Sequence, residues 1–251
     1  AQHELAPVYA SVNIATDQNQ LTMETLKKVA LRQDLVCLLH EKPFAKVNGS
    51  GKHNNWSLST ASGENLFKPG SHPEKNTRFL LFLCAVIQAV HEHQDLLRIT
   101  VATAGNDRRL GGHEAPPAIV SIFLGSELTD ILSSIKNGTE YRAANVADME
   151  TGVHVLPNIP ADTTDRNPTS PFAFTANKFD FRMVGSSMSV AEPNIILNTI
   201  IADALSQFAN RLEKAEDFET EVYALMRESL KKHDCVIFNG NNYTEAWKKE
   251  A

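Results

Sequence analysis

The chain has 251 residues, of which 42% are hydrophobic and 22% are charged, and its formal net charge is −6. This hydrophobic content can build a sizeable core and excludes an intrinsically disordered protein. The 24 basic residues are scattered, which predicts no nucleic-acid partner, and the sequence holds no apolar run long enough to predict a membrane partner.

The predicted elements alternate between helical and extended patterns. Apolar residues at every third or fourth position predict helices, and compact β-rich runs predict strands. The predicted helices are residues 21–32, 77–93, 117–135, 194–213 and 217–232, and the predicted strands are residues 36–40, 98–103 and 178–183. Asp217 is the expected N-cap of the last helix, because its side chain can accept a hydrogen bond from an amide of the first turn.

Cysteine usage indicates the cellular compartment. Cys37, Cys84 and Cys235 lie far apart and lack the paired spacing of a metal site. Cys37 and Cys84 stand in apolar runs, which favours buried, reduced thiols over a disulfide. Reduced thiols are typical of the cytoplasm, so the sequence predicts a cytoplasmic protein.

Long polar stretches rich in Gly or Pro separate the elements, at residues 48–73, 104–117 and 151–177. Such loops are uncommon in compact domains unless they serve a site. The first contains NGSGKHNNWS, whose glycines allow the backbone to approach a ligand and whose amides could hold an anion. It is not a P-loop, because Lys46 replaces the required Gly and His53 the required Ser or Thr. His53 is therefore either a ligand-binding or an ordinary surface residue.

Charged residues in the second loop and in the last strand allow two interpretations each. In GNDRRLGGHEAPPA, Arg109 could grip a carboxylate or phosphate, or could pair with Glu114 in a solvated loop. In the strand 178–183, Asp180 and Arg182 share one face. They could form a plain ion pair on a half-exposed edge strand. Alternatively, Asp180 could bind a hard cation while Arg182 grips a substrate anion.

Four long motifs occur in an order that resembles the type III glutamine synthetases. They are HEKPF followed by NGSGKHNNWS, then GNDRRLGGHEAPPA, DRNPTSPFAFTANKFDFRMVGSS and IFNGNNY. The similarity runs from about Gln2 to Trp247. It implies an α+β catalytic domain in which a curved antiparallel sheet carries the site loops and helices pack behind it.

The resemblance implies an ATP-dependent ligase that joins ammonia to glutamate through γ-glutamyl phosphate, with Mg²⁺ or Mn²⁺ bound. Phosphoryl transfer of this kind depends on positioning and charge neutralisation more than on covalent help. The resemblance also implies a homo-oligomer with active sites shared between subunits.

The same resemblance assigns roles to individual residues. The metal ligands are Glu4, His53 and Asp180; glutamate is bound by Asn48, Gly49, Gly51, Arg109 and Arg182; nucleotide phosphate is contacted by Asn55 and Ser57; and the catalytic residues are Glu114, Arg109 and Arg166. Glu114 corresponds to the flap glutamate that shields the intermediate and helps to deprotonate ammonium. Arg166 belongs to an Arg-Asn-Arg pattern that neutralises the transferred phosphate.

Several residues depart from the family pattern. Pro168 replaces the second arginine of Arg-Asn-Arg, and Asp180 stands where the family usually has Glu. Lys46 and Ala176 replace usual glycines, and each is expected to be strained if its position needs a positive φ. Residues 10–13 supply no second carboxylate for the metal of Glu4. These departures motivate a second hypothesis, a relative that binds ATP or glutamate as a sensor or scaffold without turnover.

The domain organisation implied by the resemblance is a partial catalytic domain over residues 1–251. The family's N-terminal β-grasp domain and the strands that supply further metal ligands are expected to precede Ala1. We therefore predict that the isolated 251-residue chain has negligible synthetase activity. A third hypothesis is a ligase for another amine or acid, although Arg109 and Arg182 favour an α-amino acid.

Overall fold

The computed structural model describes residues 4–112, 114–141 and 169–251. The helices are α1 (Val12–Arg32), α2 (Thr77–Ile99), α3 (Ala104–Arg109), α4 (Ser126–Asn137), α5 (Ala191–Leu212), α6 (Phe218–His233) and α7 (Glu245–Glu250), with short 3₁₀ turns at Pro73–Lys75 and Asp234–Val236. The strands are β1 (Gly51–Trp56), β2 (Ile122–Phe123), β3 (Phe172–Thr175) and β4 (Lys178–Gly185). The predicted α+β class is confirmed.

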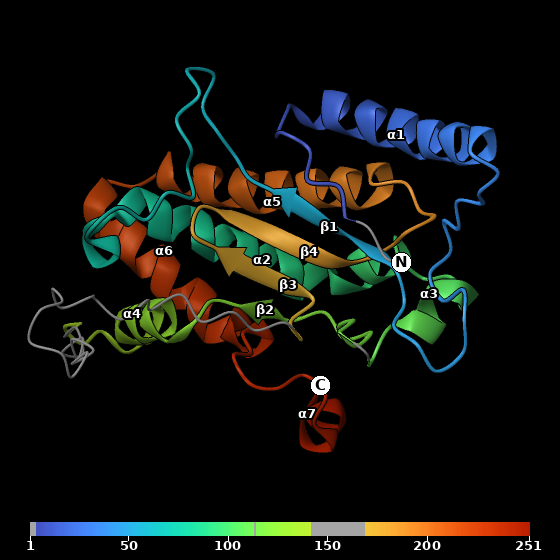
Figure 1. Cartoon of the computed structure of the whole chain (residues 1–251). Helices are drawn as coiled ribbons and strands as arrows, with labels where there is room; N and C mark the ends of the chain where they lie inside the picture. The colour runs from blue at the N-terminus through green and yellow to red at the C-terminus, as the bar shows by residue number, and fades with distance from the viewer. Residues whose placement is uncertain (1–3, 113, 142–168) are drawn as a thin grey trace, which may run out of the picture.

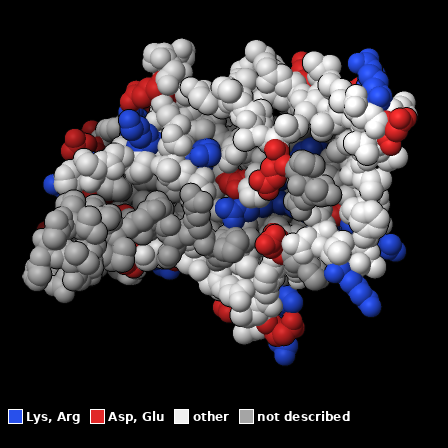
Figure 2. Space-filling model, viewed as in Figure 1, with Lys and Arg blue, Asp and Glu red and all other residues white. Residues whose placement is uncertain are grey.

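The strands form one sheet in the order β1-β4-β3-β2 (Figure 1). β4 pairs antiparallel with β1 on one side and with β3 on the other, whereas β2 joins β3 in parallel. The sheet is therefore mixed at its β2 edge and is not antiparallel throughout. β4 is an inner strand, and its alternating pattern does not mark a sheet edge. Figure 2 shows acidic and basic side chains gathered near the middle of the face that is turned toward the viewer.

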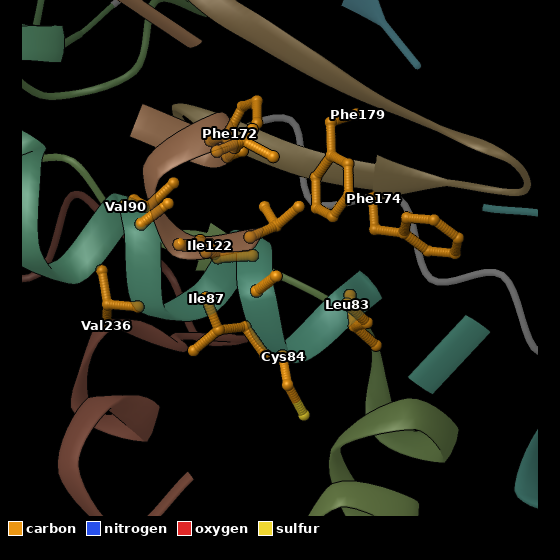
Figure 3. Close-up of a cluster of buried hydrophobic side chains, with 14 of the residues drawn as sticks. Leu83, Cys84, Ile87, Val90, Ile122, Phe172, Phe174, Phe179 and Val236 are labelled. Atoms are coloured by element: carbon orange, nitrogen blue, oxygen red, sulfur yellow. The ribbon is translucent and has the colours of Figure 1, made fainter. Parts of the chain in front are cut away.

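The core lies between the sheet and α2. Phenylalanines of β3 and β4 point toward Leu83, Ile87 and Val90 of α2 (Figure 3). Phe172 and Phe179 stack across the two strands with ring centroids 4.8 Å apart. Helix α2 packs in turn against α5 and α6, and these three helices lie behind the sheet in Figure 1. One face of the sheet is thus committed to the core, and the other is free to carry polar side chains.

Two of the later helices were predicted well. The bounds of α5 and α6 differ from the predicted ranges 194–213 and 217–232 by three residues or fewer. Asp217 caps α6 as expected, because its Oδ1 accepts a hydrogen bond from the Thr220 amide at 3.3 Å. The cysteines are free, with Cys84 buried, Cys37 half-buried and Cys235 exposed. In the described part of the chain, no helix combines the length and the apolar character needed to cross a membrane.

Two predictions in the middle of the chain were wrong. Residues 98–103 form the end of α2 and a turn instead of a strand, because α2 continues to Ile99 through non-helical angles at His93. Packing of the helix end into the core buries Val101 of this stretch and the preceding Leu97 fully, whereas Ile99 is 68% exposed. The predicted helix 117–135 begins only at Ser126, after Gly125 with φ of 80°. Of the preceding residues, Ile122 and Phe123 form β2 instead.

The N-terminal segment is the least buried part of the fold. Helix α1 begins nine residues before the predicted start at residue 21, and it has no buried residue. The predicted strand at residues 36–40 has no regular structure, and Val36 is 81% exposed. Most of the exposed large hydrophobic side chains of the described chain lie between Leu5 and Val47. A strand needs a neighbour for its backbone hydrogen bonds, and no described strand pairs with residues 36–40.

Candidate functional site

The central feature of the site is a bulge on β4 opposite His53. Lys52 pairs with Val184 and Asn54 pairs with Phe181, so β4 has one residue more than β1 in this interval. Bulges bend a strand and redirect its side chains, and they are common beside active sites. Here the bulge lets His53 and Asp180 meet on the polar face, with 2.8 Å between His53 Nδ1 and Asp180 Oδ2.

Asp180 is held by two donors. Arg182 Nε donates to Asp180 Oδ2 at 2.7 Å, and His53 Nδ1 contacts the same oxygen. Burial alone would raise the pKa of the Asp180 carboxyl, but the hydrogen bonds from His53 and Arg182 outweigh burial and lower it. The carboxylate is therefore ionised at neutral pH. Of the two interpretations of Asp180 and Arg182, the structure shows the ion pair.

The other oxygen of this carboxylate lacks a donor in the described part of the protein. Asp180 Oδ1 is buried and accepts no hydrogen bond within the described residues. A buried carboxylate oxygen without a donor suits a hard cation such as Mg²⁺ or Mn²⁺, which prefers oxygen ligands. The described residues contain no group of three or more His, Cys, Asp or Glu side chains that could hold a metal. Glu4 is exposed and does not form a three-ligand group with His53 and Asp180.

Arg109 lies beneath the glycine loop and is only 8% exposed. Its Nη1 donates to Asn106 Oδ1 at 3.0 Å and to the carbonyls of Met183 and Val184, each at 3.3 Å. Its Nη2 donates to the carbonyl of Arg182 at 3.1 Å. The guanidinium thus satisfies carbonyls at the β4 bulge, and it does not pair with Glu114 as the solvated-loop interpretation required. Burial lowers the pKa of Arg109.

Two of the glycines predicted to bind glutamate are required by Arg109. A Cβ at Gly51 would lie 2.0 Å from Arg109 Nη2, and a Cβ at Gly49 would lie 2.7 Å from Arg109 Cγ. Glycine at both positions lets the backbone pass this close to the Arg109 side chain, at its guanidinium for Gly51 and at its aliphatic part for Gly49. The loop and Arg109 are therefore one packed unit, in which a change at any of the three positions displaces the others.

Asn48 and Glu114, predicted as separate parts of the site, are in contact. Asn48 Nδ2 donates to Glu114 Oε2 at 3.2 Å, although 66 residues separate them. Glu114 has φ of 67°. The adjacent carbonyl of Ala115 accepts a hydrogen bond from Tyr243 Oη at 2.8 Å, so the C-terminal segment helps to fix this loop.

Asn55 and Ser57, predicted to contact nucleotide phosphate, follow His53 at alternate positions. Alternate residues of a strand share a face, and His53, Asn55 and Ser57 are exposed. Asn55 is opposite Asp180 in the β1–β4 register. Ser57 Oγ donates to the Asn177 carbonyl at 3.1 Å, in the turn between β3 and β4. Arg166 and Pro168 lie outside the described residues.

One site residue received no role from the sequence. Glu41 stands in the HEKPF motif, is 4% exposed, and contacts the glycine loop and the end of β4. A single acidic residue between an apolar run and a proline gives no pattern that distinguishes it from a surface glutamate. Its burial could have been inferred only from the tertiary structure.

The two residues that replace family glycines both have a positive φ. Lys46 has φ of 64° and Ala176 has φ of 59°. This region is unfavourable for residues with a Cβ. The condition of the strain prediction, a positive φ, is therefore met at both positions.

Comparisons with known proteins agree with the motif resemblance. Residues 1–121 match the family described as "Glutamine synthetase, catalytic domain", and residues 221–251 match the "Glutamine synthetase C-terminal domain". The chain is 51% identical over 253 residues to the "Type-3 glutamine synthetase" of Dictyostelium discoideum, covering 100% of this chain and 34% of that protein. It is 48% identical over 256 residues to a "Glutamine synthetase" of Butyrivibrio fibrisolvens, covering 100% of this chain and 36% of that protein.

A solved structure gives independent support for the fold. The protein described as "Apo GmaS without ligand" superimposes with a TM-score of 0.51 at 14% identity, over 94% of this chain and 52% of that chain. At this identity the similarity shows the fold alone. The chain spans about one third of the length of the curated relatives it matches. The chain belongs to the glutamine synthetase family.

Proposed function

We propose that the protein containing this chain ligates ammonia to glutamate at the expense of ATP. The observation that carries this proposal is the arrangement of the predicted site residues on and beside β1 and β4. His53, Asp180 and Arg182 form one contact group, and Asn48 contacts Glu114 beside the loop packed on Arg109. A site of carboxylates, guanidinium groups and a glycine loop suits phosphoryl transfer, which depends on positioned charge.

The reaction has two steps. An oxygen of the glutamate side-chain carboxylate bonds to the terminal phosphorus of ATP, and ADP leaves. Ammonia nitrogen then bonds to the acyl carbon of γ-glutamyl phosphate, and inorganic phosphate leaves. Ammonium must first lose a proton, which we assign to the carboxylate of Glu114, held by Asn48. A positioned base of this kind typically contributes about 10²–10⁴-fold.

We assign glutamate to Asn48, Gly49, Gly51, Arg109 and Arg182, and nucleotide phosphate to Asn55 and Ser57. To grip glutamate, Arg109 must exchange one of its internal acceptors for the substrate carboxylate. Arg166 would neutralise the transferred phosphate. Mg²⁺ or Mn²⁺ would be held by His53 and Asp180 at one site and by Glu4 at another, and would supply positive charge to the phosphate oxygens. The buried Oδ1 of Asp180 supports this assignment.

We further propose a cytoplasmic homo-oligomer with active sites shared between subunits. The exposed apolar side chains between Leu5 and Val47 support a partner surface in this part of the chain. In Figure 2 the surface over α1 is largely white, with few charged side chains. Analytical ultracentrifugation of the longest natural protein that contains this chain tests the assembly, and a monomer at micromolar concentration contradicts it.

The test of the activity is phosphate release from ATP by that longest natural protein, with glutamate, Mg²⁺, and with or without ammonium. Ammonium-dependent release supports the ligase. Release by the wild type and by Glu140→Gln, but not by Glu114→Gln, would assign the base, since Glu140 is an exposed glutamate outside the site.

No release by a folded, metal-loaded protein would favour the binding relative instead. Pro168→Arg is then the variant to measure, since it restores the Arg-Asn-Arg pattern. Release with a different acid or amine in place of glutamate or ammonium would favour a ligase of other specificity.

A further inference from the structure

Glu41 joins two segments that carry predicted glutamate-binding residues. Its backbone carbonyl accepts a hydrogen bond from the Ser50 amide at 2.8 Å, inside the loop of Asn48–Gly51. Its Oε1 accepts a hydrogen bond from the Ser187 amide at 3.0 Å, just after β4, and another from the Ser187 hydroxyl. The two segments also bond directly, since the Ser186 amide donates to the Ser50 carbonyl at 3.2 Å.

Three glycines close around Glu41. A Cβ at Gly49 would lie 2.5 Å from the Glu41 carbonyl, and a Cβ at Gly185 would lie 2.5 Å from Glu41 Cγ and Oε1. A Cβ at Gly105, in α3, would lie 3.2 Å from Oε2. The backbone of Gly185 and of Gly105 thus lies close to the Glu41 side chain, which leaves that side chain little room to change its length or the place of its acceptor atom.

The charge of Glu41 also matters to its neighbours. Burial lowers the pKa of Arg109, and the negative charge of Glu41 opposes that effect. Lys52 shows the same balance, with its pKa lowered by burial to about 8 while Glu41 acts to raise it. These effects act through space, whereas the direct hydrogen bonds of Glu41 are to the two serines. The hydrogen bonds of Glu41 and its negative charge can therefore be tested separately.

We propose that Glu41 is a positioning residue for the glutamate site. By holding Ser50 and Ser187 together, it fixes the Asn48–Gly51 loop over Arg109 and against the end of β4. The expected effect on the KM for glutamate rests on the proposed function. The expected effect on the loop position rests only on the contacts of Glu41. A displacement of about 1 Å in such a loop can lower the rate or the affinity on the order of 10²-fold.

Two substitutions separate the effect of side-chain length from the effect of charge. Glu41→Asp keeps the charge but withdraws the acceptor from Ser187, whereas Glu41→Gln keeps an oxygen at the same reach and removes the charge. In the longest natural protein we expect Glu41→Asp to raise the KM for glutamate at least tenfold, with the KM for ATP changed less than twofold. Glu41→Gln should change the glutamate KM by less than Glu41→Asp does. Glu140→Asp is the matched control and should change neither KM.

The opposite order, with Glu41→Gln the worse variant, would overturn the positioning role in favour of a purely electrostatic one. Equal rises in both KM values would show only general damage, and would also overturn the proposal. If the Glu41 variants do not fold, Ser187→Ala removes the hydroxyl partner from the other side. An unchanged glutamate KM in that variant contradicts the proposal.

A second readout separates this inference from the proposed function. Hydrogen exchange of the backbone amides of residues 48–51 and 187 should be at least tenfold faster in Glu41→Asp than in the wild type or Glu140→Asp. This measurement needs no turnover. If the wild type is not a ligase, faster exchange still supports the positioning role, and unchanged exchange refutes it.

Discussion

Replacing Ala176 by glycine should stabilise the protein, although it removes a methyl group. Ala176 lies in the two-residue turn between β3 and β4, and its φ is 59°. The Asn177 amide donates to the Thr175 carbonyl at 2.6 Å, which closes a tight three-residue turn around Ala176. Such a turn with positive φ is rare and strained for a residue with a Cβ.

The expected gain follows from two opposing terms. Relief of the left-handed conformation gives about 1–2 kcal/mol, and the extra freedom of glycine in the unfolded chain removes about 0.5–1 kcal/mol. The net increase in the free energy of unfolding is thus about 0.5–1 kcal/mol. At roughly 2–4 °C per kcal/mol for a domain of this size, Tm should rise by about 1–4 °C. Urea and thermal unfolding of the purified protein measure it.

The control is the same substitution at a helical position. Ala202 is an exposed residue of α5, and Ala202→Gly should destabilise the protein by about 1 kcal/mol. Opposite signs at the two positions would show that backbone conformation decides the outcome. Destabilisation at both positions would refute the reasoning from φ.

Three further predictions concern the site and the N-terminal segment. Asp180→Asn should destabilise the protein by about 3 kcal/mol at neutral pH, because it removes the paired negative charge from Arg182, whose side chain is only 12% exposed. Folding lowers the pKa of Asp180, so its contribution to the free energy of unfolding is complete above the unfolded value near 3.8 and is lost as pH falls through the folded pKa. The free energies of unfolding of wild type and variant should therefore converge in acid. A difference that stays constant with pH would contradict the assignment. Glu114→Gln should lower ammonium-dependent turnover about 10²-fold or more with little change in ATP binding by calorimetry, whereas an unchanged rate would remove Glu114 as the base. Amides of residues 36–40 should exchange at least tenfold more slowly in the longest natural protein than in the 251-residue chain, and equal exchange would show that this β-rich run gains no partner strand there.

The elements that the sequence predicted correctly are those whose pattern depends on one buried face. Helices α5 and α6 bury a continuous apolar stripe, and their bounds agree with the periodicity. The run 36–40 has a strand-like composition, but a strand also needs a hydrogen-bonding neighbour, which the described residues do not supply. Around residues 98–103, packing of the end of α2, which buries Leu97 and Val101 in the core, outweighed β propensity.

The site shows the same division between local and tertiary information. Motifs identified the segments that meet, and the structure brings Asn48 to Glu114 and His53 to Asp180. The side-chain directions could not be read from the sequence, because they depend on the bulge in β4 and on the burial of Arg109. Glu41 was missed for the same reason: its partners are Ser50 and Ser187, and the latter lies 146 residues away.

The position of Arg109 explains why the loop, the bulge and the charged strand belong together. A bulge leaves backbone carbonyls of β4 without ladder partners, and buried carbonyls require donors. The planar guanidinium of Arg109 meets the carbonyls of Arg182, Met183 and Val184 at once, which the single ammonium of a lysine could not do in the same geometry. Because Gly51 then packs on this guanidinium and Gly49 packs on the aliphatic part of the same side chain, movement of Arg109 toward a bound carboxylate would also displace the loop and the bulge beside Asp180. Binding of glutamate at one end of this unit, as proposed, would thereby shift the buried Oδ1 of Asp180 at the other end.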